Sequence, residues 1–110
     1  MNIYYDVPIT FAEAALGATI KIPTLEGTEE YNIPEGTQPG TVFTLKNRGV
    51  TEVHGSRRGN LSFRVNVEVP KNLSAKQKEL IKEFSDSCGD KNNTQKKGFF
   101  DKLKDTFKNL

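Results

Sequence analysis

The feature that most constrains the fold of this chain is a change of hydrophobic period at Pro70. From Leu61 to Val69 apolar and polar residues alternate, which is the period of a strand with one buried and one wet face, as in an antiparallel sheet or sandwich. After Pro70 apolar residues recur every three or four positions, as in an amphipathic helix. The sequence therefore predicts a mainly β fold, with a small β-sandwich-like domain over residues 1–70 and a helical segment over residues 71–110.

Shorter signals divide the first part of the chain into further elements. Thr10 and Glu13 form a capping box before a six-residue helix that Gly17 would end. A hairpin turn is expected at Glu26-Gly27, and a basic, Gly-containing loop at residues 46–60. Four more strands are predicted, at residues 2–9, 19–22, 30–33 and 42–45.

The second part of the chain predicts two amphipathic helices joined by a polar linker near residues 89–97. Ser74 and Gln77 form a capping box for the first helix. In each helix the apolar residues fall within an arc of about 100°. They are Leu80, Ile81, Phe84 and Cys88 in the first helix, and Phe99, Phe100, Leu103, Phe107 and Leu110 in the second. Short helices are marginal alone in water, so both stripes need cover.

Periodicity leaves three kinds of cover open for the last helix. It could fold back on its own β domain, or it could dock on the first helix and on a second copy of the chain. It could also lie on a membrane, although Asp101 and Asp105 interrupt its basic face.

Catalysis and metal binding have little support in the residues. His54 could act as a base and Ser56 as a nucleophile, but the sequence offers no carboxylate placed to orient the histidine. We therefore expect no enzyme activity. His54 and the single Cys88 lack the spacing of metal ligands. Arg57 and Arg58 could contact nucleic acid, but no aromatic residues are interleaved with them. No apolar run reaches the length of a membrane span and no signal peptide is visible.

Several motifs in a fixed order resemble the second C-terminal domain of the DnaJ family of co-chaperones. They are Asp6-Val7-Pro8-Ile9-Thr10-Phe11-Ala12-Glu13-Ala14-Ala15-Leu16-Gly17, Ile33-Pro34-Glu35-Gly36-Thr37-Gln38-Pro39-Gly40 and Val65-Asn66-Val67-Glu68-Val69-Pro70. Residues 97–104 are similar to the extreme C-terminus of bacterial members. The chain departs from the family at Asn47, where Gly is frequent, near Thr51, where Pro is frequent, and at Asn60, where Asp is frequent. Asn tolerates left-handed backbone, so the turn at Asn47 can survive.

The resemblance implies a cytoplasmic homodimer that supports binding of unfolded client proteins for handover to a DnaK-type chaperone. The J domain, the zinc region and the first C-terminal domain of the family are not in this sequence, so no cofactor is expected here, and no client-binding residue is assigned. We expect the dimer contact at Leu80, Ile81, Phe84, Phe99, Phe100, Leu103 and Phe107. The alternatives are a self-contained peptide-binding β module and, further off, a nucleic-acid-binding module using the loop at 46–60. Neither nucleic acid nor a membrane is expected as a partner.

Overall fold

The computed structural model describes residues 1–51 and 58–110. The chain divides into two units, Met1–Lys71 and Asn72–Leu110, and each is described by itself. Among these residues, the first unit holds the five strands and one short helix, and the second holds two longer helices. The predicted mainly β fold followed by two helices is confirmed.

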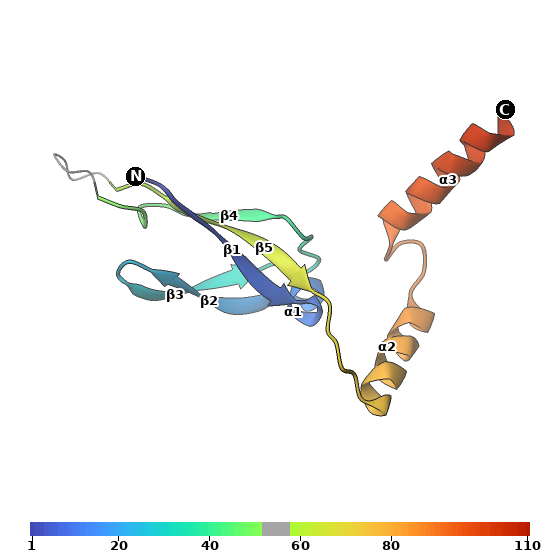
Figure 1. Ribbon diagram of the computed structural model, residues 1–110, viewed down its shortest axis with the longest axis horizontal. Coiled ribbons are helices and arrows are strands. Elements are labelled where there is room, and N and C mark those ends of the chain that lie inside the picture. Colours follow the sequence, from blue (N-terminus) through green and yellow to red (C-terminus); the bar gives the residue numbers. More distant parts are fainter. Residues whose placement is uncertain (52–57) are drawn as a thin grey trace. The chain divides into compact units, whose positions relative to one another are not determined.

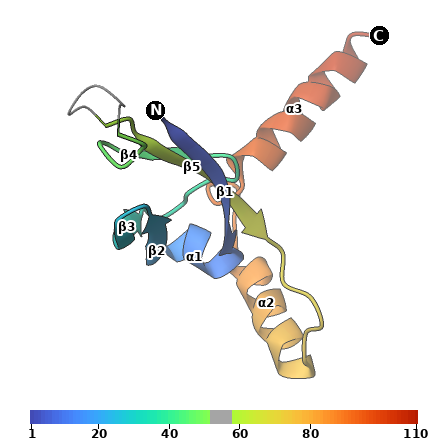
Figure 2. The same cartoon turned by 60° about the vertical axis from the view of Figure 1, so that its left-hand side comes forward.

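The β domain has two layers, which Figure 1 shows one above the other. One layer is a sheet in the order β1-β5-β4, made of β1 (Ile3–Thr10), β5 (Leu61–Glu68) and β4 (Val42–Leu45). The other is the antiparallel hairpin of β2 (Ala18–Thr24) and β3 (Gly27–Ile33). The short helix α1 (Phe11–Leu16) lies at one end of the domain (Figure 2).

The core lies between the layers because each strand turns alternate apolar residues inward. Phe63 of β5 is fully buried, and its ring meets Tyr31 edge-on at 5.3 Å and Phe43 at 5.5 Å between ring centroids. Four strands, β1, β2, β3 and β5, and the helix α1 supply the rest of the buried cluster. Its other members are Ile9, Ala14, Ile20, Ile22, Ile33, Leu61 and Val65.

Three details of the β domain differ from the expectation. The sheet is mixed, since β5 pairs in parallel with β1 and antiparallel with β4. The hairpin turn is one residue earlier than expected, because Gly27 already pairs with Thr24. Val69 is 75% exposed, since β5 ends at Glu68, the last residue that pairs with β1.

The loop after β3 is held against α1. The backbone N–H of Thr37 donates to the carbonyl of Ala14 at 3.0 Å, and its hydroxyl donates to the carbonyl of Pro34 at 2.6 Å. Gly17 ends α1 with a φ of 78°, and a side chain there would come within 2.9 Å of the Ile33 carbonyl oxygen. The motifs at residues 6–17 and 33–40 are thus adjacent in space. Backbone N–H groups of the second motif donate to carbonyls at the end of α1 in the first, so each motif completes the backbone hydrogen bonds of the other.

The second unit consists of α2 (Ala75–Ser87) and α3 (Thr94–Lys108). Ser74 and Gln77 form the predicted capping box, with the Ser74 N–H donating to the Gln77 side chain at 2.8 Å. The connection between the helices is shorter than the expected linker over 89–97, because α3 already begins at Thr94. An ion pair one turn apart, between Lys97 and Asp101, supports these extra residues as helix.

Candidate interface in the helical segment

The first candidate surface is the α2 stripe, which we define as Leu80, Ile81 and Phe84. All three side chains are about half exposed, at 47% to 52%. The capping box fixes where the helix starts, and the spacing of the three residues then places them on one face. No residue of α2 is buried.

The second candidate surface is the α3 stripe, which we define as Phe99, Phe100, Leu103 and Phe107. The three Phe side chains are 49% to 61% exposed, while Leu103 is half-buried. The neighbouring rings of Phe99 and Phe100 meet edge-on, 5.2 Å apart. The structure thus groups the seven predicted residues into two stripes, one on each helix, and it buries neither.

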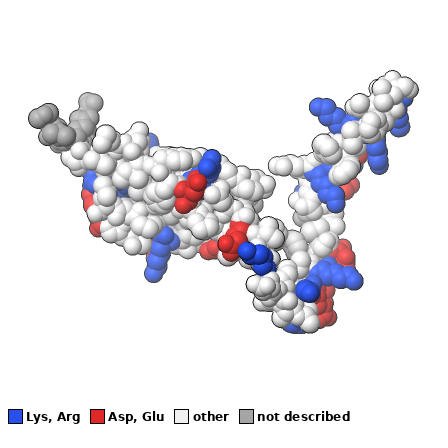
Figure 3. Space-filling model, viewed as in Figure 1, with Lys and Arg blue, Asp and Glu red and all other residues white. Residues whose placement is uncertain are grey.

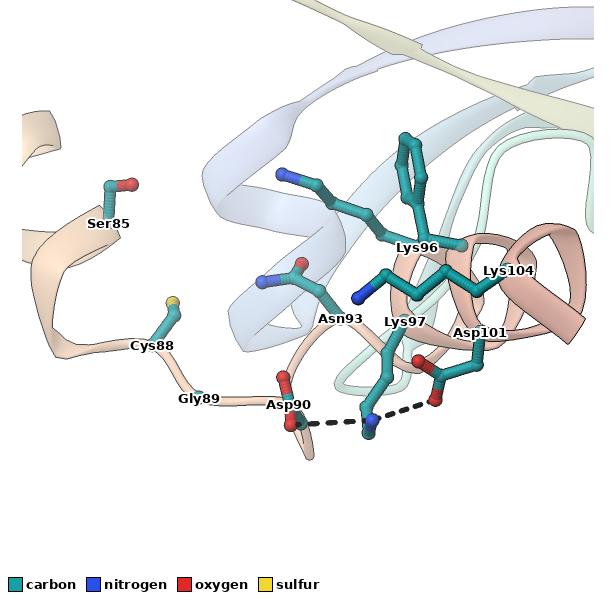
Figure 4. A pocket seen from close by; sticks show the side chains of 10 residues that line it. Ser85, Cys88, Gly89, Asp90, Asn93, Lys96, Lys97, Asp101 and Lys104 are labelled. Atoms are coloured by element: carbon teal, nitrogen blue, oxygen red, sulfur yellow. Dashed lines mark hydrogen bonds and ion pairs between the residues drawn. The ribbon is translucent and has the colours of Figure 1, made fainter. Parts of the chain in front are cut away.

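The connection between the helices is a compact turn. The Gly89 N–H donates to the Asn92 side chain at 2.9 Å, and the Asn92 N–H donates back to the Gly89 carbonyl at 3.0 Å. Lys97 contacts Asp101 at 2.7 Å and Asp90 at 3.8 Å, so it links the turn to the first part of α3 (Figure 4). The hydrogen bond from Lys97 holds the pKa of the Asp101 carboxyl below its ordinary value.

A cavity of about 490 Å³ lies between the end of α2 and the start of α3 (Figure 4). Its walls include Cys88, Asn93 and Phe100, together with the ammonium-bearing side chains of Lys96 and Lys104. The cavity is open and mostly polar. It is therefore a poor match for the apolar segments of an unfolded chain, which need dry contact.

The charges of the chain are unevenly distributed along it. Residues 91–110 contain six Lys and two Asp, a net charge of +4, whereas the whole chain has +2, so residues 1–90 carry −2. On the visible face of α3, Lys side chains predominate (Figure 3). The stripe of α3 is therefore bordered by positive charge.

The basic loop offers less to nucleic acid than its composition suggests. The guanidinium of Arg48 pairs with Glu29 at 2.5 Å, and that of Arg58 pairs with Glu26. Both carboxylates come from the β2–β3 hairpin, so these cations tie the loop to the domain and are already neutralised. His54, Ser56 and Arg57 lie outside the described residues.

Residues 1–51 and 58–110 contain no group of three or more side chains placed to hold a metal ion. No helix in these ranges is long and apolar enough to cross a membrane. A peptide-binding groove on the β domain stays a prediction.

The match to known families follows the two units of the chain. Residues 1–70 match the family described as the DnaJ C terminal domain, and residues 76–109 match the Chaperone protein DnaJ C-terminal region. The chain belongs to the DnaJ family. The Chaperone protein DnaJ of Ruminiclostridium cellulolyticum is 52% identical over 107 residues, which cover 97% of this chain and 28% of that protein. Those of Clostridioides difficile and Listeria monocytogenes are 49% and 48% identical, each over 97% of this chain and 28% of the relative.

This DnaJ-family chain thus spans little more than a quarter of the length of the curated relatives it matches. Two of the three positions at which the sequence departs from the resemblance, Asn47 and Asn60, meet at one turn. Asn47 adopts the left-handed conformation expected of it, with a φ of 62°. The Asn47 N–H donates to the side-chain oxygen of Asn60 at 3.1 Å, so the amide at position 60 supplies the acceptor for this turn.

Proposed function

We propose that the helical segment of this chain holds two copies of it together, and that the pair supports the binding of unfolded client proteins. The observation that carries the proposal is the pair of exposed apolar stripes on α2 and α3. The family match to a chaperone C-terminal region over residues 76–109 agrees with a role for this segment beyond closing the β domain.

The energetic argument concerns the three Phe side chains of the α3 stripe. Burying a side chain of this size stabilises by roughly 1.5–3 kcal/mol. A contiguous exposed stripe is otherwise an aggregation liability. A second copy provides an apolar surface of the same kind, and a two-fold contact covers both copies with one set of residues.

Pairing would serve client binding through effective concentration. Two weak sites on one unfolded chain can exceed the affinity of either by roughly 10²–10⁴-fold without any new contact. We place handover to a DnaK-type chaperone in regions of family members outside this sequence. We assign no enzyme activity and no cofactor to residues 1–110, and we place the protein in the cytoplasm.

The test is sedimentation equilibrium of the chain, of a version without residues 90–110, and of a Phe99→Ala/Phe100→Ala variant. We expect the intact chain to be a dimer and both altered versions to dissociate at the same concentration. Leu25→Ala is the control, because Leu25 is an apolar side chain of the β domain with an exposure of 64%, close to the 61% of Phe99. A monomeric intact chain would contradict the proposal, and so would a dimer that survives the loss of both rings.

A further inference from the structure

The flank of the α2 stripe is mainly acidic and the flank of the α3 stripe is mainly basic. These charges indicate which helix packs against each stripe. At about 100° per residue the acidic residues of α2 fall in an arc of about 60°, which starts about 60° from Leu80. The basic residues of α3 fall in an arc of about 40°, which starts about 40° from Phe100. The acidic row is Glu79, Glu83 and Asp86, and the basic row is Lys97, Lys104 and Lys108. One opposite charge lies beside each row, Lys76 about 20° from Glu83 and Asp101 about 20° from Lys108, so the two flanks keep net charges of −2 (three acidic, one basic) and +2 (three basic, one acidic).

The members of both rows are exposed. Lys97 is held by Asp101 and Asp90. Within the part of the chain that the structure describes, the other two lysines and the whole acidic row make no ion pair. Five charged groups that border the stripes are therefore left for a partner.

The two rows lie on opposite sides of their stripes. Seen from the N-terminus of each helix, the acidic row of α2 is counterclockwise from its stripe and the basic row of α3 is clockwise. When two such helices face each other, stripe against stripe, the two rows come to the same side only if the helices run parallel. In an antiparallel pair the basic row of α3 would instead meet Lys78 and Lys82 of α2, and like charges would oppose one another.

A parallel pair of α2 and α3 is out of reach within one chain. With 13 residues, α2 is about 20 Å long. The chain would have to return over this whole length between the end of α2 and the start of α3. Residues 88–93 would need to be fully extended to do so, at about 3.3–3.6 Å each. They are instead folded into the compact turn closed between Gly89 and Asn92.

We propose that α3 of one copy lies parallel along α2 of a second copy, with the acidic row of α2 facing the basic row of α3. This rests on the proposed dimer and specifies its contact. By two-fold symmetry the contact occurs twice, since each copy gives its α3 and receives its partner's. The stripes supply the buried apolar area, and the charge rows select the direction and the partner helix.

The test uses two charge-reversed versions of the chain. One is Glu79→Lys/Glu83→Lys on α2, and the other is Lys104→Glu/Lys108→Glu on α3. In either version alone, like charges face each other at both contacts of the pair, and we expect self-association to weaken by at least about tenfold at low salt. In an equimolar mixture both contacts of the mixed pair again join opposite charges, so wild-type affinity should return.

Mixing is the decisive step because it rescues a contact between copies and leaves a contact within one copy unrescued. A chain with all four substitutions is the control, since opposite charges then face each other whether the contact is made within or between copies. Recovery of this control without recovery of the mixture would overturn the exchange of helices between copies. Wild-type dimerisation that neither reversal weakens would overturn the charge-matched contact while leaving the proposed function standing. A monomeric wild-type chain would instead remove the proposed function itself.

Discussion

Phe63→Leu is expected to destabilise the β domain by about 1–3 kcal/mol. Phe63 is fully buried, and its ring contacts Tyr31 edge-on and Phe43 at a tilt. Each such pair contributes about 0.5–1.5 kcal/mol beyond the area it buries. Leu keeps most of the apolar volume, so the change measures mainly the ring contacts and the small void that remains.

The assay is urea unfolding followed by tyrosine fluorescence at one fixed protein concentration. The chain has no Trp, and its three Tyr all lie in the β domain, so this signal reports on that domain and not on α2 or α3. The expected loss lowers the urea midpoint in proportion, since the free energy of unfolding falls by about 1–3 kcal/mol for each molar of urea. Fixed concentration matters because association raises apparent stability.

Leu25→Ala is the control for this experiment, since Leu25 is 64% exposed at the hairpin turn and its change should stay within about 0.5 kcal/mol. An equally small effect of Phe63→Leu would refute the reasoning. It would mean that the contacts of the Phe63 ring with Tyr31 and Phe43 contribute little to the stability of the β domain.

Three further outcomes are expected. Asn47→Ala should destabilise by about 1–2 kcal/mol in chemical unfolding, because Ala at a left-handed position is strained, while Asn47→Gly should be close to neutral. Ser74→Ala should lower the helical circular dichroism signal through loss of the α2 cap, at a cost of about 0.5–2 kcal/mol, and Ser74→Asp should restore it. The Asp101 carboxyl should titrate below its ordinary range by NMR and return to it in Lys97→Ala. Because its pKa in the folded state is lowered, its support of α3 is present above the ordinary pKa and is lost as the pH falls through the lowered one.

Local patterns in the sequence were sufficient for the elements themselves. Both capping boxes, at Thr10 and Ser74, form as expected, because their donors and acceptors lie within three residues of each other. The alternation from Leu61 to Val67 predicts the buried face of β5 for a similar reason, since the period of a strand is a local property.

Long-range pairing could not be predicted in the same way. Nothing near β1 shows that its partner is β5 or that the two run parallel. The same is true of the ion pairs that join Arg48 and Arg58 to the hairpin, because their partners Glu29 and Glu26 are distant in sequence. The start of α3 was missed because Asn93 makes no side-chain capping bond, so no cap signal marks it.

The candidate interface has one feature that the sequence predicts and one that only the structure explains. The seven apolar residues of the stripes could be found by their spacing, and the structure confirms that they lie on two helices with exposed faces. The charge rows also have a helical spacing that the sequence contains, at Glu79, Glu83 and Asp86. Their significance depends on the compact turn at Gly89, which only the structure supplies.

The parallel pairing of β1 with β5 has a consequence for the order of events during synthesis. Ile3 pairs with Leu61 and Thr10 with Glu68, so β1 cannot form its pairing until β5, the last strand of the domain, has been synthesised. Contacts of such long sequence separation slow folding, since the loop between them must close first. The residues that follow directly are α2 and α3, which we propose to be the pairing device. In a growing chain the β domain can therefore complete its sheet only when the segment proposed to recruit a second copy is about to be made.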